Sequence, residues 1–429
     1  PGSWLHETKE RGNPVNENLL ALVGGKLIDG SGKNPIADTT VLVDGKVIRE
    51  TGRKGKVKIP EGCRVIDVSG KTVMPGLMDL HVHLSMGDRD VLVPSAALSP
   101  TLGQSLTFVG IKGFAHARRS LDMGFTTLRD VGDVGFLSIA LRDAVAAGLV
   151  EGPRVVASGQ FLTTTGGHAD ALPCWVKRED EEANVADGSE GVLRAVRRQI
   201  KMKTDWIKFF ATGGIMDPWD VQEFNDQEIE TLVREAHDKG RKVCAHCMHP
   251  QGTLAAVRAG IDTVEHGSNL TGEIIDLMLK RGTFLVPTIY APYANVHRGA
   301  EYGLPKIYTE KCRPVFERHV KSFQMALKAG VKMALGTDCG YTPCIHGTNA
   351  FELELLVKYG MSPMDALLCA TRNAAEALGM GDRLGTVEKG KWADLIVIDG
   401  DPLEEIRVVQ KKEKIVLVMK EGSVCRSTL

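Results

Sequence analysis

The chain has 429 residues, 43% of them hydrophobic, which is enough for one large domain and a smaller one. Its 53 basic and 54 acidic residues give a formal net charge of −1, which argues against a nucleic-acid-binding protein or a basic membrane-surface protein. No apolar run reaches the roughly 18 residues of a membrane-spanning helix, so we expect no membrane partner.

The nine cysteines are an odd number and are scattered singly, which predicts reduced thiols and a cytoplasmic protein. Cys244 and Cys247 form a C-x-x-C pair, but neither a second pair nor a thioredoxin-like setting accompanies it, so we interpret them as buried structural cysteines. The chain begins Pro1-Gly2-Ser3 and shows no secretory pattern, although a removed leader would also give this start.

Both flanks of the chain have the pattern of short alternating strands. Residues 1–17 are polar and contain Pro, Gly and Asn, which predicts a mobile segment. Leu20–Val68 alternates around turns such as Asp44-Gly45, and Ala393–Cys425 resumes the same style. Neither flank is long enough to form a stable sheet alone, so we predict that 18–74 and 386–429 pair as one small β-sandwich.

The intervening residues 75–385 alternate apolar runs with amphipathic stretches such as Asp226–Lys239 and Pro314–Ala329. Most of these stretches end in the Gly expected after a helix. The continuous apolar strands predict the fold class α/β, a (β/α)₈ TIM-like barrel; an open doubly wound sheet would call for a Gly-rich turn after its first strand. The eight expected strands are Gly76–His83, Thr126–Val131, Arg154–Leu162, Trp206–Thr212, Lys242–Cys247, Thr263–His266, Thr283–Tyr290 and Val331–Asp338.

Chemically active residues recur at the carboxyl ends of these strands, where barrel active sites form. His81 and His83, at i and i+2 on one strand, aim two imidazoles at one point, which suits a metal such as zinc. Taken singly, each strand-end residue could serve only the structure, as a hydrogen-bonded core residue or a helix cap. This explanation fits Lys208 least well, because a lysine in an apolar strand is rarely buried without a partner. The other strand ends carry His246, His266 and Asp338.

The conjunction of these residues resembles the amidohydrolase superfamily, in its two-metal subtype with a carboxylated lysine. The matching motifs are Pro75-Gly-Leu-Met-Asp-Leu-His-Val-His83, Ile207-Lys-Phe-Phe-Ala-Thr-Gly-Gly214, Ala245-His246, Val264-Glu-His266, Leu335-Gly-Thr-Asp338 and the stretch beginning at Gly385. Thr165-Gly-Gly-His-Ala-Asp170 and Pro343-Cys-Ile-His-Gly-Thr-Asn349 are similar to the branch with Xaa-Pro and Xaa-Arg/Lys dipeptidases, imidazolonepropionase-related proteins and the ochratoxin-hydrolysing amidase.

The resemblance implies two divalent metal ions, for which zinc is our prediction although cobalt, manganese and iron accept the same ligands. One metal would be held by His81, His83 and Asp338, and the other by His246 and His266. N6-carboxylated Lys208 and a hydroxide would bridge them. Asp338 would act as general base and acid.

The resemblance also indicates substrate-binding residues in the loops. His168, after the third strand, is expected to donate to the substrate and to take part in catalysis. Tyr290 and His346 are further candidates. Relatives commonly carry Ala-His-x-His after the fifth strand, whereas this chain reads Ala245-His-Cys-Met-His249, so the substrate role of His249 is open.

These expectations predict a metal-dependent amidohydrolase that acts on a small molecule, a dipeptide or an N-acyl amino acid, ochratoxin-like amides included. The alternative is a cyclic amide, urea, carbamate or aryl amide cleaved by the same centre, possibly a xenobiotic. A cationic or multi-donor carboxylate clamp would discriminate between them, but few arginines lie near the strand ends, Arg129 being the nearest, so the clamp is not obvious from the sequence. A non-enzymatic relative would have lost ligands, and all six are present. Homo-oligomers are common among relatives and are expected here.

Overall fold

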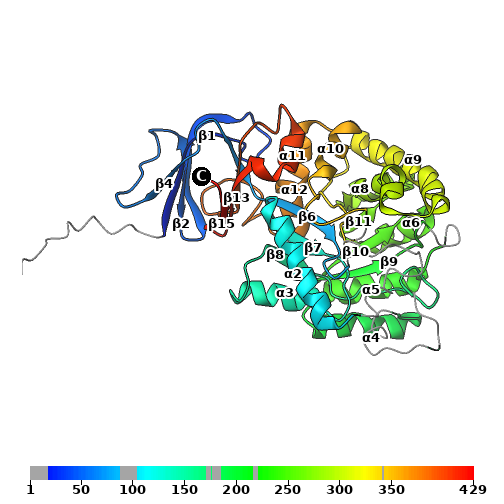
Figure 1. Ribbon diagram of the computed structural model, residues 1–429. Coiled ribbons are helices and arrows are strands. Elements are labelled where there is room, and N and C mark those ends of the chain that lie inside the picture. Colours follow the sequence, from blue (N-terminus) through cyan, green and yellow to red (C-terminus); the bar gives the residue numbers. More distant parts are fainter. Residues whose placement is uncertain (1–17, 87–103, 171–174, 176–184, 216–220, 341–342) are drawn as a thin grey trace, which may run out of the picture.

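The computed structural model describes residues 18–86, 104–170, 175, 185–215, 221–340 and 343–429. The segment 1–17, predicted to be mobile, lies outside these residues. Figure 1 shows two parts, a sheet to which both flanks of the chain contribute and a barrel ringed by helices.

The flanking sheet joins the two ends of the chain. Its eight strands are hydrogen-bonded into one continuous sheet in the order β15-β14-β13-β5-β1-β2-β3, with β4 pairing β1. The predicted pairing of the flanks is therefore confirmed, and it occurs where β13 runs antiparallel to β5. The strands are β1 Leu19–Leu27, β2 Ile36–Asp44, β3 Val47–Arg53, β4 Arg64–Asp67, β5 Thr72–Pro75, β13 Leu395–Ile398, β14 Ile415–Lys420 and β15 Ser423–Ser427.

The barrel consists of parallel strands, as the apolar runs predict. Three strands pair as β6-β7-β8 and four as β9-β10-β11-β12, and the two groups meet where Leu162 bridges Phe209. The strands are β6 Leu77–Val82, β7 Phe125–Asp130, β8 Arg154–Ala157, β9 Trp206–Phe210, β10 Lys242–Cys247, β11 Thr263–His266 and β12 Phe284–Val286.

The eighth predicted strand, Val331–Asp338, closes the barrel without forming a regular strand. Single bridges join Met333 to Leu285 and Cys339 to Val82, and the amide of Asp338 donates to the carbonyl of His81 at 2.7 Å. Asp338 has a φ of +63°, which ends the extended geometry. Gly336 allows the close approach, because a Cβ there would lie 2.8 Å from the Cβ of His81.

Helices surround the barrel and cover its outer face (Figure 1). A capping box between Asn225 and Glu228 starts α5, close to the predicted position. In contrast, α9 begins at Lys306 rather than at Pro314, because Tyr308 and Cys312 extend its buried face by two turns. The helices are α2 Leu106–Asp122, α3 Leu137–Ala146, α4 Gly188–Lys201, α5 Asp226–Asp238, α6 Pro250–Ala259, α7 Gly272–Arg281, α8 Tyr290–His297, α9 Lys306–Ala329, α10 Phe351–Lys358, α11 Pro363–Cys369 and α12 Arg372–Leu378.

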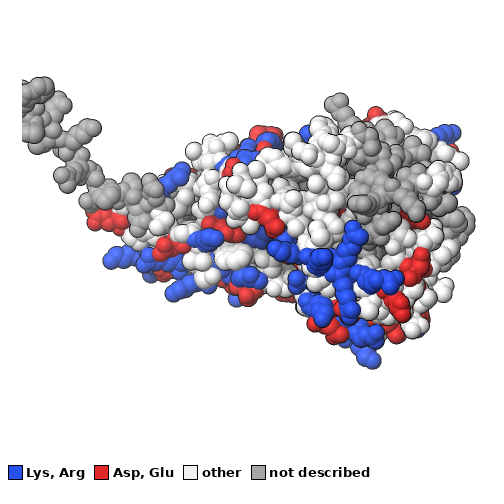
Figure 2. Space-filling model, turned by 90° about the horizontal axis from the view of Figure 1, so that it is seen from below, with Lys and Arg blue, Asp and Glu red and all other residues white. Residues whose placement is uncertain are grey.

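Two surface properties follow from these helices. Within the described ranges no helix is both long and apolar enough to cross a membrane. Figure 2 shows basic side chains gathered over the face that carries α3 and α4, with acidic side chains among them. On this face Arg197 pairs with Glu235 at 2.7 Å, so part of the positive charge is neutralised locally.

Candidate metal centre

Two histidines at the end of β6 present the same ring nitrogen to one point. His81 Nδ1 lies 2.7 Å from Glu265 Oε2, and His83 Nδ1 lies 2.9 Å from the carbonyl oxygen of Gly132. Both partners are acceptors, so each imidazole carries its proton on Nδ1. The lone pair of each ring is therefore on Nε2.

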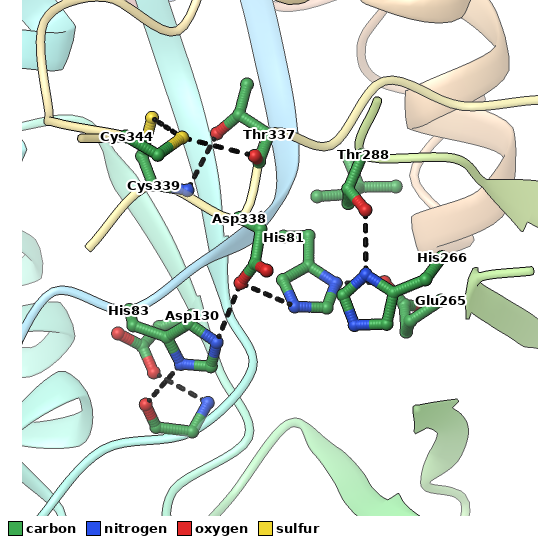
Figure 3. A network of polar contacts seen from close by, with 12 residues as sticks. His81, His83, Asp130, Glu265, His266, Thr288, Thr337, Asp338, Cys339 and Cys344 are labelled. Atoms are coloured by element: carbon green, nitrogen blue, oxygen red, sulfur yellow. Dashed lines mark hydrogen bonds and ion pairs between the residues drawn. The ribbon is translucent and has the colours of Figure 1, made fainter. Parts of the chain in front are cut away.

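Asp338 completes a three-residue cluster with these two rings (Figure 3). Its Oδ1 lies 3.3 Å from His81 Nε2 and 3.3 Å from His83 Nε2. The three ligand atoms all lie within 4.8 Å of one another. Three electron-pair donors facing one point repel each other unless a cation lies between them, and His-His-Asp suits a divalent metal. The donor set therefore fits a resident metal ion.

Electrostatics favours the ligating form of His83 and of Asp338. Burial lowers the pKa of His83, which keeps its imidazole neutral despite the nearby carboxylate. Burial would raise the pKa of Asp338, but its interaction with His81 and His83 in their protonated forms outweighs burial and holds that pKa well below its usual value. A neutral imidazole and an ionised carboxylate are the forms that bind metal.

His266 and His246 continue the cluster as a chain of touching rings. The centroids of His81 and His266 are 4.7 Å apart, and those of His266 and His246 are 4.5 Å apart. His266 Nδ1 lies 2.7 Å from Thr288 Oγ1, while the buried Nε2 of His246 has no hydrogen-bond partner within the described ranges. A buried imidazole nitrogen that has no hydrogen-bond partner and lies beside other imidazoles is suited to bind a second metal ion. Burial lowers the pKa of both rings well below the usual value.

Lys208 lies inside the barrel on β9, where its side chain is 1% exposed. Its Nζ is 5.4 Å from the centroid of the Phe210 ring, and no carboxylate of the described residues pairs with it. In the pairing of β9 with β10, Lys208 lies opposite Cys244, two residues before His246. Five of the predicted ligands thus lie together at one end of the barrel, and Lys208 lies on the strand next to the one that carries His246.

A buried ion pair that the sequence analysis did not assign holds His81. Glu265 Oε2 accepts from His81, and Glu265 Oε1 lies 2.7 Å from Arg129 Nη2. Arg129 also donates to the carbonyl of Leu80 at 2.6 Å. Glu265 and Arg129 are fully buried, and the guanidinium contributes to lowering the pKa of Glu265 despite burial. Arg129 is therefore an internal brace and is not available to clamp a substrate carboxylate.

Replacing Glu265 with glutamine should weaken metal binding about 10- to 100-fold, because the amide no longer fixes the His81 tautomer as firmly. Chelator-competition titration measures this, and Glu230→Gln, at an exposed position of α5, is the matched control. Glu265→Gln alone leaves the buried charge of Arg129 without its ion-pair partner, which could destabilise the fold. The double variant Glu265→Gln with Arg129→Met removes that charge, so it separates a loss of stability from a loss of metal affinity. Unchanged metal affinity in both variants would contradict this role.

Asp79 braces the other side of the cluster. The fully buried carboxylate accepts from the amide of His81 at 3.1 Å, from the Thr337 hydroxyl at 2.6 Å and from Asn349 Nδ2 at 2.7 Å. Burial raises the pKa of Asp79 to about 6. The side chain thereby ties β6 to the segment that carries Asp338.

Backbone strain orients His266. His266 and Thr288 have φ values of +67° and +50°, a region that non-glycine residues rarely adopt. Regular side-chain alternation ends at His266, so both Glu265 and His266 reach His81. Glu352 secures the Thr288 turn, because its carboxylate accepts the amides of Ile289 at 2.8 Å and Tyr290 at 2.6 Å.

His168 joins the end of the chain of rings, and its catalytic role stays a prediction. Its ring stacks on His246 with the centroids 4.9 Å apart and contacts Phe210 at 5.0 Å. The amide of His168 donates to Glu223 at 2.8 Å. Gly214 leaves the room for the ring, because a Cβ there would lie 2.2 Å from His168 Cε1.

Of the other three candidate substrate residues, Tyr290 and His346 direct their polar atoms at groups other than the ligand atoms. Tyr290 points its hydroxyl at Thr348 Oγ1, 2.9 Å away. His346 is buried behind the centre, with Nε2 3.2 Å from the carbonyl of His83 and its ring stacked on His116. His249 is the N-cap residue of α6.

The criterion that singled out Lys208, a charged residue within an apolar strand, could also have found Glu265, Arg129 and Asp79. Each is a charged residue within an apolar strand, and two of them lie in the motifs that carry His81 and His266. Thr288 and Glu352 carry no such signal, since their roles depend on a turn and a helix that meet only in the fold.

The comparison with known families rests on nearly the whole chain. The model of the amidohydrolase family matches residues 72–425, which include all six predicted ligands. The chain belongs to the amidohydrolase family. The centre described above is that of a metal-dependent hydrolase of C–N bonds.

Three relatives illustrate how far this amidohydrolase is similar to characterised proteins. It is 32% identical to ochratoxinase from Aspergillus niger over 96% of this chain and 91% of that protein. A crystal structure of a Xaa-Pro dipeptidase with bound methionine in the active site is 34% identical, with a TM-score of 0.85, and covers 95% of this chain and 100% of that one. A prolidase complexed with N-methylphosphonate-L-proline is 32% identical, with a TM-score of 0.86, over 96% and 100%.

Proposed function

We propose that this amidohydrolase cleaves the amide bond of a dipeptide or an N-acyl amino acid, ochratoxin-like amides included. The observation that carries the proposal is the convergence of His81 Nε2, His83 Nε2 and Asp338 Oδ1. Support for the substrate class comes from the relatives: one is named for ochratoxin, two are peptidases, and the bound methionine and proline phosphonate both present a carboxylate.

The residues that would hold the metals are His81, His83 and Asp338 for one ion and His246 and His266 for the other, with carboxylated Lys208 between them and zinc as the predicted metal. When bound, such ions supply Lewis-acid polarisation of the carbonyl and lower the pKa of water. Glu265 and the carbonyl of Gly132 fix the tautomers of His81 and His83 in advance, and burial lowers the pKa of His83, His246 and His266.

Asp338 moves the proton in the proposed reaction. Its carboxylate accepts a proton from the attacking water as the oxygen adds to the carbonyl carbon, and it delivers that proton to the leaving nitrogen as the C–N bond breaks. His168, stacked beside His246, is proposed to donate a hydrogen bond to the substrate oxygen. The cytoplasmic location and homo-oligomeric assembly stay predictions; sedimentation measures the latter.

A substrate screen on protein of measured metal content tests the proposal. We expect turnover of dipeptides or N-acyl amino acids, loss of that turnover on chelation, and recovery on adding back zinc. Turnover of ureas, carbamates or cyclic amides without any turnover of dipeptides and N-acyl amino acids would replace the proposed substrate class by the alternative one.

A further inference from the structure

Arg298, directly after α8, carries a charge that no described carboxylate neutralises. Its Nη1 donates to Tyr290 Oη at 3.2 Å, and its Nη2 donates to Tyr302 Oη at 2.7 Å. The guanidinium also lies 5.3 Å from the centroid of the Tyr302 ring. The side chain is half-buried, and two phenol oxygens satisfy only part of a guanidinium with five N–H donors.

The position of this guanidinium connects two loops of the centre. Tyr290, which it contacts, follows Thr288, the residue that holds His266. The same Tyr290 hydroxyl reaches Thr348, in the loop that follows Asp338. Arg298 therefore lies by the loops after the seventh and eighth strands, at the end of the barrel that carries the metal ligands.

Two other cations of the described residues, Arg129 and Lys208, are buried too deeply to meet a substrate carboxylate. Arg129 is fully buried and paired with Glu265. Lys208 is 1% exposed, inside the barrel. Arg298 is half-buried and therefore keeps solvent access, and the two tyrosines hold its planar fork in place. A fixed fork with free N–H donors suits a carboxylate, which accepts two parallel hydrogen bonds.

We propose that Arg298 binds the free carboxylate of the substrate and thereby selects amides of α-amino acids over ureas, carbamates and amides without a carboxylate. The inference rests on the proposed amide hydrolysis. Tyr290 and Tyr302 orient the guanidinium, which gives Tyr290 an indirect role in binding in place of the direct contact expected from the sequence.

Paired substrates test the inference on the metal-loaded enzyme. N-acetyl-L-methionine and N-acetyl-L-methioninamide differ only in the carboxylate. In Arg298→Met we expect kcat/KM for the acid to fall about 10²-fold, mainly through KM, and kcat/KM for the amide to change less than about threefold. For Arg298→Lys we expect an intermediate loss of kcat/KM for the acid. Tyr302→Phe should lower kcat/KM for the acid a few-fold, because the guanidinium is then held less firmly. Equal losses on both substrates, or an unchanged preference for the acid, would overturn the inference.

A binding measurement tests the role of Arg298 separately from the proposed amide hydrolysis. Calorimetric titration with L-methionine and L-methioninamide needs no turnover, and we expect only the acid to bind more weakly to Arg298→Met and Arg298→Lys. Binding that depends on Arg298, without turnover of any N-acyl amino acid or dipeptide, rejects the function but supports the inference. The inference is rejected if turnover of the acid or binding of L-methionine is the same in the Arg298 variants as in the wild-type enzyme. It is also rejected if L-methionine does not bind the wild-type enzyme.

Discussion

Changing Asp338 to asparagine should lower kcat by about 10³-fold or more, while most of the metal content is retained. The amide keeps an oxygen close to where Oδ1 lies, 3.3 Å from His81 Nε2 and from His83 Nε2, so the ligand position is still filled. It cannot accept the proton from water or return it to the leaving nitrogen, and general acid–base catalysis contributes about 10² to 10⁴ in rate. Steady-state kinetics alongside metal analysis separates the two effects.

Asp276→Asn makes the same chemical change at an exposed position of α7 and should leave kcat within about twofold. An Asp338→Asn enzyme with near-full activity would rule out Asp338 as the proton carrier. An enzyme that has lost both activity and metal would instead show that Asp338 acts chiefly as a ligand.

The sequence was enough to predict the barrel and the place of its site, because both rest on strong local patterns. Continuous apolar runs with Gly-terminated helices specify parallel strands, and parallel strands bring their carboxyl ends together. His81, His246 and His266 therefore meet, although 185 positions separate the first from the last, as follows from residue numbers alone. The flanks also pair as predicted, since neither can bury its apolar face alone.

The features that escaped prediction depend on geometry that local pattern does not encode. Asp338 has a left-handed backbone, so an apolar run that appears to be a strand closes the barrel through single bridges. Arg129 is the arginine nearest to a strand end in the sequence, and its guanidinium turns inward to Glu265. Tyr290 begins a helix, and its hydroxyl meets Thr348 and Arg298 instead of the ligand atoms.

Changing Lys208 to methionine should remove most bound metal at the second site and lower kcat/KM by about 10³-fold or more, as expected when a metal ligand is lost. The physical reason lies in the environment of the amine, which is 1% exposed and lacks a carboxylate partner among the described residues. A neutral amine in such a place can add to carbon dioxide: the nitrogen bonds to carbon, one N–H proton leaves, and a carbamate anion results. That anion supplies oxygen ligands that an ammonium cannot.

The melting temperature of Lys208→Met distinguishes the loss of metal and activity from misfolding. Without metal, Lys208→Met exchanges a buried polar amine for an apolar side chain of similar length, so the melting temperature of the metal-free protein should stay the same or rise. Lys239→Met, at the end of α5, is the matched control and should leave metal content and kinetics unchanged. A large fall in the melting temperature of the metal-free variant would indicate that Lys208 is needed for the fold.

Labelling reports on the modification itself. Metal-loaded wild-type protein assembled in ¹³C-bicarbonate should show a carbamate carbon signal by NMR that is missing from Lys208→Met, and assembly in buffer stripped of carbon dioxide should slow the recovery of activity. Wild-type protein that reaches full metal content and activity without taking up label would show that Lys208 acts as an unmodified amine, and the two metals would then need another bridging ligand.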